Sequence, residues 1–205
     1  MKKIFIRYWF LTLAMALFLF SCNSKSFDTK QELLDYLKDE ENGYLQKKNV
    51  NGVDFSLMYR PTDLLVEQEL TGNISKELVD SLRKKYEKYI YFNLSISKNN
   101  KALLSTIPDN RDDFAVLVNQ LSFRMRDKVF LVTNSKDTIE LVDYVYPRMF
   151  GLSKTTSLMF VYKRDELKVK NGYLNFIVKD LNLFTGDIKF KVPAKKINKK
   201  LTLSF

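Results

Sequence analysis

The sequence contains no histidine and a single cysteine, Cys22, among its 205 residues. With one thiol the chain cannot close an internal disulfide, and without imidazole it cannot build a Cys/His zinc site. The nucleophile–base pairs Cys–His and Ser–His are excluded for the same reason. Gly-rich phosphate loops and the Asp-x-Asp-x-Asp-Gly calcium loop are also missing. We therefore expect no metal site and no cofactor.

Glycine and proline are scarce, with six and four residues, whereas phenylalanine and tyrosine number 16 and 11. Phenylalanine and tyrosine favour half-buried pleated surfaces, so the composition favours a sheet-rich protein. Hydrophobic residues make up 45% of the chain and charged residues 28%, which is usual for a globular protein with a core. No Gly/Ser-rich or Pro-rich linker interrupts the chain after residue 21, and no internal repeat occurs.

The first 21 residues have the parts of an export signal. Lys2, Lys3 and Arg7 give a positive start, and residues 8–20 form an apolar or nearly apolar run of 13 residues. A helix needs about 20 apolar residues to cross a bilayer. The run is too short for that, so we expect a cleaved signal peptide over residues 1–21.

The sequence Leu-Phe-Ser-Cys ends this segment at Cys22. It resembles the lipobox of bacterial lipoproteins. The resemblance implies cleavage between Ser21 and Cys22, acylation of the Cys22 sulfur, and a mature N-terminus anchored in a membrane by its lipid. A buried cysteine behind an ordinary signal is the alternative.

The residues that follow Cys22 and the composition of the chain predict where in the cell the protein is located. Asn23 stands where many proteobacterial lipoproteins of the inner membrane have aspartate. The Lys-, Asn- and Tyr-rich chain resembles uncharacterised envelope lipoproteins of Bacteroidetes, and the residues after Cys22 lack the acidic cluster that resembles a surface-export tag in that group. The resemblance implies the outer membrane, with the protein facing the periplasm.

The chain has an excess of positive charge. Its formal charge is +10, and the signal segment carries three of the 34 basic residues and no acidic one, which leaves +7. An exported protein rarely meets nucleic acid, so we expect no nucleic-acid partner. An anionic membrane face or an acidic protein of the envelope is the expected counterpart. A solvated surface that keeps the protein soluble explains the same charge without a partner.

Lysines are densest near the C-terminus, and tyrosines cluster in an expected strand before them. On an edge strand, lysines also discourage pairing with another sheet, and a half-buried sheet also explains the tyrosines. The candidate binding patch consists of Lys189, Lys191, Lys195, Lys196, Lys199, Lys200, Tyr144 and Tyr146.

Helical spacing and turn residues predict the elements. Helical segments begin at Thr29, at Thr62 or Asp63, at Ser75 and at Asn110. Thr29 opens a capping box, and Gly43 ends that segment. The pair Asn51-Gly52 predicts a hairpin turn before a strand at residues 53–60, and residues 90–96 alternate as another strand. Later strands are expected at 129–133, 138–146, 156–163, 173–182 and 187–193.

These elements predict an α+β fold, with two to three helices of the first half packed on a mainly antiparallel sheet and a C-terminal β-meander. We expect residues 22–27 to be the lipidated cysteine and a short tether. Residues 28–205 then form a single domain, with a subdivision near residue 128 left open.

The leading functional hypothesis is a non-enzymatic envelope lipoprotein that binds a protein partner or an envelope component. One alternative is a glycan-acting enzyme that uses paired carboxylates, with the candidate pairs Glu67 and Glu69 or Asp112 and Asp113. The other is a periplasmic carrier of an apolar ligand, which would need an enclosed apolar cavity.

Overall fold

The computed structural model describes residues 24–106, 111–147, 153–169 and 171–205. The expected signal peptide and its cleavage and lipidation site at Ser21 and Cys22 lie outside these residues. The fold is α+β with mainly antiparallel sheets, and a series of strands fills the C-terminal part, so the predicted fold class is confirmed. Among the described residues, none of the helices combines the length and the hydropathy that crossing a bilayer requires.

The larger sheet has six strands, and all its neighbouring pairs are antiparallel. Its order is β2 (Leu45–Val50), β3 (Val53–Arg60), β4 (Tyr89–Lys98), β9 (Thr156–Lys163) and β8 (Leu141–Val145), and β5 (Lys101–Ala102) also pairs with β4. The predicted hairpin turn joins β2 to β3. Asn51 and Gly52 have φ angles of 52° and 74°, the left-handed conformation that this tight turn requires.

The smaller sheet has four strands in the order β11 (Ile188–Pro193), β10 (Tyr173–Val178), β6 (Val129–Thr133) and β7 (Thr138–Ile139). The segment 138–146, expected as one strand, is interrupted at Glu140, where the chain passes from the smaller sheet to the larger one. Residues on both sides of position 128 share a sheet, because β9 pairs with β4.

The two sheets pack against each other through aromatic side chains. Phe92 of β4 and Phe160 of β9 are fully buried, and both contact Phe176 of β10, with ring centroids 5.4 and 5.6 Å away. Each such ring buries roughly 150–250 Å². The protein therefore rests on an aromatic core, which a domain without disulfides needs.

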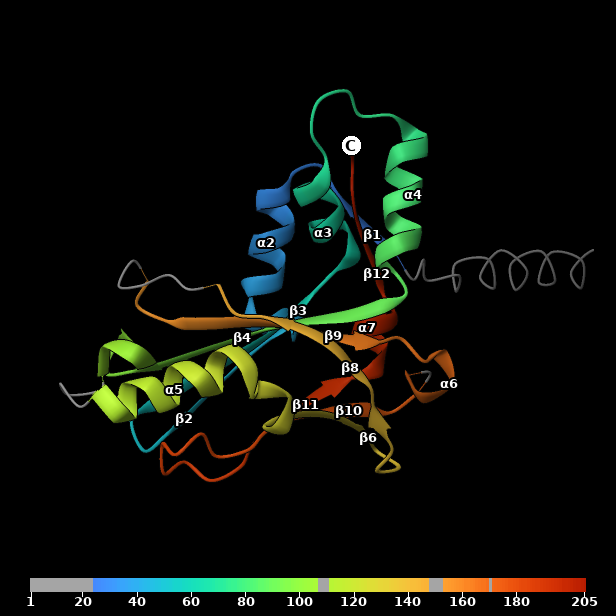
Figure 1. Cartoon of the computed structure of the whole chain (residues 1–205). Helices are drawn as coiled ribbons and strands as arrows, with labels where there is room; N and C mark the ends of the chain where they lie inside the picture. The colour runs from blue at the N-terminus through green and yellow to red at the C-terminus, as the bar shows by residue number, and fades with distance from the viewer. Residues whose placement is uncertain (1–23, 107–110, 148–152, 170) are drawn as a thin grey trace, which may run out of the picture.

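The helices lie on the two sides of this core (Figure 1). The longer ones are α2 (Lys30–Lys38), α3 (Thr62–Glu69), α4 (Lys76–Tyr86) and α5 (Arg111–Phe123). Short turns are η1 (Glu40–Asn42), η2 (Leu103–Thr106), η3 (Met125–Asp127), α6 (Glu166–Val169) and α7 (Ala194–Asn198). In Figure 1, α2, α3 and α4 stand above the larger sheet, and α5 lies below it.

Two predicted helix starts are confirmed. The Thr29 hydroxyl accepts a hydrogen bond from the Glu32 backbone N–H at 3.2 Å, and the Ser75 hydroxyl does the same for Leu78. One other predicted helix start differs. Pro61 occupies the cap position of α3, so the prediction of a cap at Thr62 or Asp63 is wrong. The predicted start at Asn110 lies outside the described residues.

Residues Ser24–Phe27 form a strand, β1, that pairs in parallel with β12 (Lys200–Leu203). Ser24 aligns with Lys200, and the Phe27 side chain is only 7% exposed, 5.1 Å from the ring of Tyr36. The prediction of a free tether up to Phe27 is therefore wrong for these residues. The first three side chains of β1 are exposed, so the segment has the polarity of a linker.

Candidate functional site

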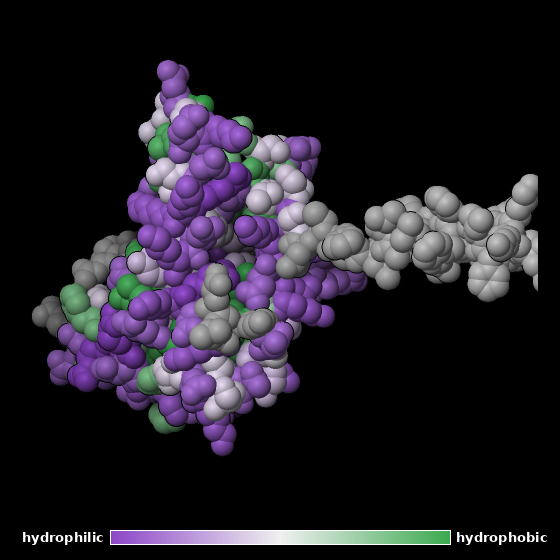
Figure 2. Space-filling view, turned by 90° about the vertical axis from the view of Figure 1, so that its right-hand side faces the viewer, coloured by the Kyte–Doolittle hydropathy of each residue, from purple (hydrophilic) through white to green (hydrophobic). Residues whose placement is uncertain are grey.

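A cleft of about 960 Å³ opens between the helices above the larger sheet and the end of that sheet. Its lining residues come from the start of α3, from the ends of α4, β9 and α7, and from β12. Figure 2 views the molecule from the right-hand side of Figure 1, and the surface that grey atoms leave visible there is mostly hydrophilic. The charged residues that line the cleft are Asp63, Arg83, Glu87, Lys88, Lys163, Arg164, Lys199 and Lys200.

A buried ion pair forms one wall of the cleft. Asp63 is 2% exposed, and its carboxylate accepts hydrogen bonds from Arg83 Nε at 3.0 Å and Nη2 at 2.6 Å. It also accepts from the backbone N–H of Leu203 at 2.7 Å, while Arg83 donates to the Leu203 carbonyl at 3.0 Å. The hydrogen bond that Arg83 donates to Asp63 raises the pKa of Arg83. This network ties α3, α4 and β12 together, so we assign both charges a structural role.

Arg164 also lines the cleft and is held by its own contacts. Its guanidinium donates to the carbonyl of Ile197 at 3.4 Å and to the side-chain oxygen of Asn198 at 3.3 Å. Its backbone N–H donates to the carbonyl of Lys88 at 2.9 Å, which places the end of β9 beside the start of β4. The buried hydroxyl of Tyr59 also donates to Ile197, at 3.3 Å, and burial raises the pKa of this tyrosine. This part of the lining is therefore fixed by its own hydrogen bonds.

Four lysines also line the cleft, and their side chains are not held by an ion pair of the kind that Arg83 forms. Lys88 directly precedes β4, Lys163 ends the neighbouring β9, and Lys199 and Lys200 lie at the junction of α7 and β12. Within the described ranges, no carboxylate lies within 4.0 Å of any of these four ammonium groups. We call them the cleft lysines. Glu87 is the remaining acid in the lining, since Asp63 is paired.

The electrostatic consequence is a cleft with six basic and two acidic residues, a formal excess of four positive charges. Two like charges 4 Å apart repel by about 1 kcal/mol even in water. Folding alone gains nothing from gathering them. A cleft lined by charge of one sign focuses its field and concentrates ions of the opposite sign. The arrangement is typical of a site for an anion.

The predicted patch is divided among several places. Lys199 and Lys200 line the cleft, whereas Lys189 and Lys191 are exposed on β11, at the edge of the smaller sheet. Lys191 Nζ lies 3.8 Å from the ring centroid of Tyr173. The remaining pair lies on α7: Lys195 is exposed, and Lys196 donates to the Asn42 carbonyl at 2.6 Å.

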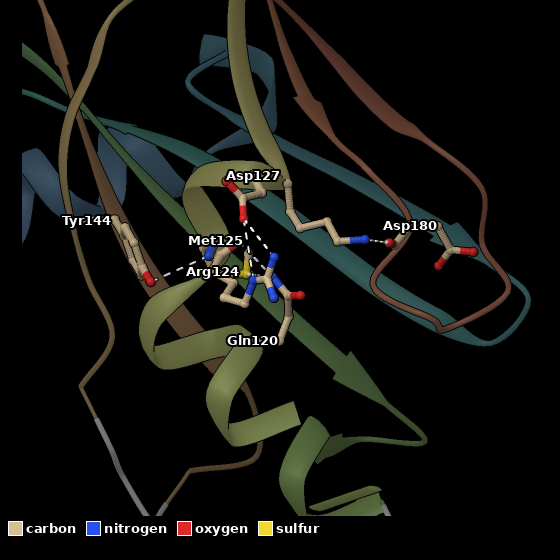
Figure 3. A network of polar contacts seen from close by, with 7 residues as sticks. Gln120, Arg124, Met125, Asp127, Tyr144 and Asp180 are labelled. Carbon is tan, nitrogen blue, oxygen red and sulfur yellow. Dashed lines mark hydrogen bonds and ion pairs between the residues drawn. The ribbon is translucent and has the colours of Figure 1, made fainter. Parts of the chain in front are cut away.

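The tyrosines of the predicted patch pack against the core. Tyr144 and Tyr146 are both half-buried. The ring of Tyr144 stacks on Phe160 with centroids 5.8 Å apart, and its hydroxyl accepts a hydrogen bond from the Met125 backbone at 3.4 Å (Figure 3). Burial raises the pKa of Tyr144. These contacts hold η3 against β8, and they account for Tyr144 without a binding role.

The carboxylates proposed for glycan chemistry have separate partners. Glu67 pairs with Lys30 at 2.7 Å, and Glu69 pairs with Lys85 at 2.9 Å and accepts a hydrogen bond from Tyr86. That hydrogen bond lowers the pKa of Glu69. Asp112 and Asp113 are exposed in the first turn of α5. In the part of the chain that the structure describes, no three His, Cys, Asp or Glu side chains gather as metal ligands.

The sequence reasoning missed most of this cleft. Lys88 follows a helix and Lys163 ends a strand, where a lysine is unremarkable, so no local signal marked either residue. Arg83 likewise lies in the polar part of an amphipathic helix. Asp63 carried a weak signal, because it directly precedes the apolar run Leu64-Leu65-Val66, which the structure buries.

No protein-family model and no curated protein matches the chain. Among solved structures, it is similar to a protein of unknown function from Burkholderia pseudomallei, with 8% sequence identity and a TM-score of 0.38. The similarity covers 82% of this chain and 87% of that one. A likeness at this level carries no functional information.

Proposed function

We propose that this protein is a lipid-anchored, non-enzymatic component of the cell envelope that binds an anionic partner in its basic cleft. The observation that carries the proposal is the convergence of the four cleft lysines without an acidic partner. The lipobox-like sequence at Cys22 supports the anchor, and residue usage supports the outer membrane, facing the periplasm.

The chemistry of the cleft supports binding over catalysis. The chain has no histidine, and the cleft has only Glu87 as an acid outside the Asp63–Arg83 pair. A carboxylate mechanism for glycan cleavage needs two carboxyl groups converging on one bond. Lysine ammonium groups are compact charges that bind anionic oxygens without a fixed geometry. The cleft therefore suits recognition of charge.

The lining also favours an anion over an apolar ligand. Eleven of the sixteen lining residues are polar or charged, so an apolar molecule would displace water from charged groups without replacing their interactions. Carriers of apolar ligands use pockets lined mainly by hydrophobic side chains. A headgroup, an acidic peptide or another anionic envelope component fits this lining better.

Photo-crosslinking in living cells tests the binding proposal. A benzophenone amino acid replaces Thr202, which lines the cleft, and in a second strain it replaces Thr138, exposed on β7 of the other sheet. We expect adducts from position 202 that disappear with Lys88→Glu and Lys163→Glu, and none from position 138. Equal adducts at both positions, or adducts that survive the charge reversal, would contradict the proposal.

The anchor has its own test. We expect Cys22→Ala to abolish incorporation of a fatty-acid analogue and to shift the protein to the precursor form or to the soluble fraction. Metabolic labelling followed by membrane fractionation measures both outcomes. Equal labelling of wild type and variant would disprove lipidation at Cys22.

A further inference from the structure

We infer that the cleft binds the phosphate headgroups of the same leaflet that holds the protein's own lipid anchor. The inference rests on the proposed lipidation of Cys22, and it deepens the proposed function by naming the anion. Four points support it: the residue at which β1 begins, the contacts that hold β1, the lysines of the cleft that form no ion pair, and the short stretch of chain between β1 and the proposed anchor.

The register of β1 places the anchor beside the cleft. Ser24 aligns with Lys200 in the parallel pair of β1 and β12, and neighbouring strands lie about 5 Å apart. Cys22 precedes Ser24 by two residues, which span at most about 7 Å. By chain length alone, an anchor at Cys22 is therefore attached within roughly 12 Å of the Cα atom of Lys200.

The attachment leaves the cleft little freedom to turn away from the bilayer. A long flexible tether would let the folded body rotate, but here the strand begins two residues after the anchor. Phe27, at the other end of β1, is buried against Tyr36, and the Ser204 backbone donates to the Phe27 carbonyl at 3.0 Å. The membrane surface therefore lies close to Lys200, one of the residues that line the cleft.

The charges at this end of the molecule match a phosphate surface. The cleft lysines carry no ion pair in the described parts of the chain, and Lys88, Lys163 and Lys200 are exposed. Lys25 of β1 adds another positive charge, its ammonium 3.9 Å from the ring centroid of Tyr36. Each lysine near an anionic membrane strengthens binding roughly fivefold, and the effect extends over a Debye length of about 8–10 Å.

The same closeness disfavours an acidic protein as the occupant. A protein partner would have to enter between the cleft and a membrane that begins within roughly 12 Å of Lys200. A headgroup is already there and needs no such space. The cleft, at about 960 Å³, is large enough to admit a phosphodiester with its polar substituent.

Lysine protection measures this contact. The full mature protein, lipidated and purified from membranes, is placed in nanodiscs of phosphatidylcholine alone or of phosphatidylcholine with phosphatidylglycerol, and treated briefly with an acetylating reagent. By mass spectrometry we expect acetylation of the cleft lysines to slow by about tenfold in the anionic discs. Lys101, on β5, and Lys136, in a turn, are exposed and do not line the cleft, so they are internal controls whose rates stay unchanged. High salt should remove the difference.

Two further arms identify the source of the phosphate. Glycerol phosphate is added to discs of phosphatidylcholine alone. If it protects the cleft lysines as well as phosphatidylglycerol does, the cleft binds free phosphate esters and the inference is overturned. A variant with Lys88→Ala and Lys163→Ala should lose most of the lipid-dependent protection of Lys200. The matched variant with Lys189→Ala and Lys191→Ala should keep it, and equal protection in both variants also overturns the inference.

The outcomes separate this inference from the proposed function. If position 202 crosslinks to a protein while phosphatidylglycerol gives no protection, the cleft binds an anionic partner but the lipid inference is wrong. If position 202 gives no adducts above position 138 and no protection occurs, both fail. Phospholipid adducts at position 202 together with selective protection support both.

Discussion

The C-terminal stretch of the sequence supplies lysines to two regions of the molecule, the edge strand β11 and the cleft. The surroundings of the lysines differ between the two regions. Lys189 and Lys191 alternate with the buried Phe190 and Val192 on an edge strand. Lys199 and Lys200 lie at the junction of α7 and β12, where Lys88 and Lys163 from distant parts of the chain also line the cleft. The first pair is spread along a strand, whereas the second becomes part of a concentrated charge.

The difference teaches that lysine density along a sequence does not predict where positive charge converges. On β11 the lysines have local explanations. Lys191 lies over the ring of Tyr173, and charged side chains on an edge strand discourage pairing with another sheet. In the cleft no local interaction accounts for them. If the two regions differ in this way, substitutions in them should change the free energy of unfolding differently.

The largest expected effect comes from breaking the Asp63–Arg83 ion pair that lines the cleft. Asp63→Ala leaves Arg83 without its partner in a partly buried site and removes an acceptor from the Leu203 N–H. We expect the free energy of unfolding to fall by about 3 kcal/mol, measured by urea denaturation. The control Glu69→Ala breaks an exposed pair with Lys85 and should cost less than about 1 kcal/mol. Similar losses in both variants would show that the buried network does not stabilise the cleft.

The next prediction concerns β1, the strand that pairs with β12 beside the cleft. Phe27→Ala removes a ring that is 7% exposed and packs near Tyr36, so we expect a loss of about 2–3 kcal/mol. Hydrogen exchange should accelerate in β1 and β12 and change little in β11. Phe184, which is 85% exposed, provides the control, because Phe184→Ala should be nearly neutral. Unchanged exchange in β12 would contradict the role given to β1.

The smallest effect compares the two regions directly and predicts opposite signs. Lys191→Ala loses the contact with Tyr173 and should destabilise the protein by about 0.5–1 kcal/mol. Lys200→Ala relieves repulsion among the cleft lysines and should be neutral or stabilising by up to about 0.5 kcal/mol at low salt. Salt should abolish the second effect. Thermal unfolding at two ionic strengths measures both, and a destabilising Lys200→Ala would show that this lysine has a structural partner.

Local chemistry predicted much of the fold. Thr29 and Ser75 are caps because their hydroxyls bond to backbone N–H groups three residues later, and Asn51-Gly52 turns because both residues accept positive φ angles. Turns and alternation located β6, β9 and β11, whereas the expected strand 138–146 is two strands of different sheets and the strand expected at 173–182 ends at Val178. All these signals act over a few residues, so the sequence displays them directly.

The cleft could not be predicted in this way, because long-range contacts create it. Asp63 reads as a helix cap until Arg83, twenty positions later, and Leu203 are placed beside it. Lys88 and Lys163 meet through the pairing of β4 with β9. The parallel partner of β1 is 176 positions away at Lys200, and three exposed side chains hide the strand.

The pairing of β1 with β12 also sets an order on folding. A chain that leaves the ribosome or the export channel from its N-terminus presents Ser24–Phe27 long before Lys200–Leu203 exists to receive it. Contacts between residues so distant in sequence form slowly, because a long loop must close before they form. The sheets around Phe92, Phe160 and Phe176 can assemble earlier, since their strands lie closer in sequence. Pairing of β1 with β12 therefore comes late in folding, and a chain that stops short of Leu203 would leave Phe27 exposed as a target for proteolysis.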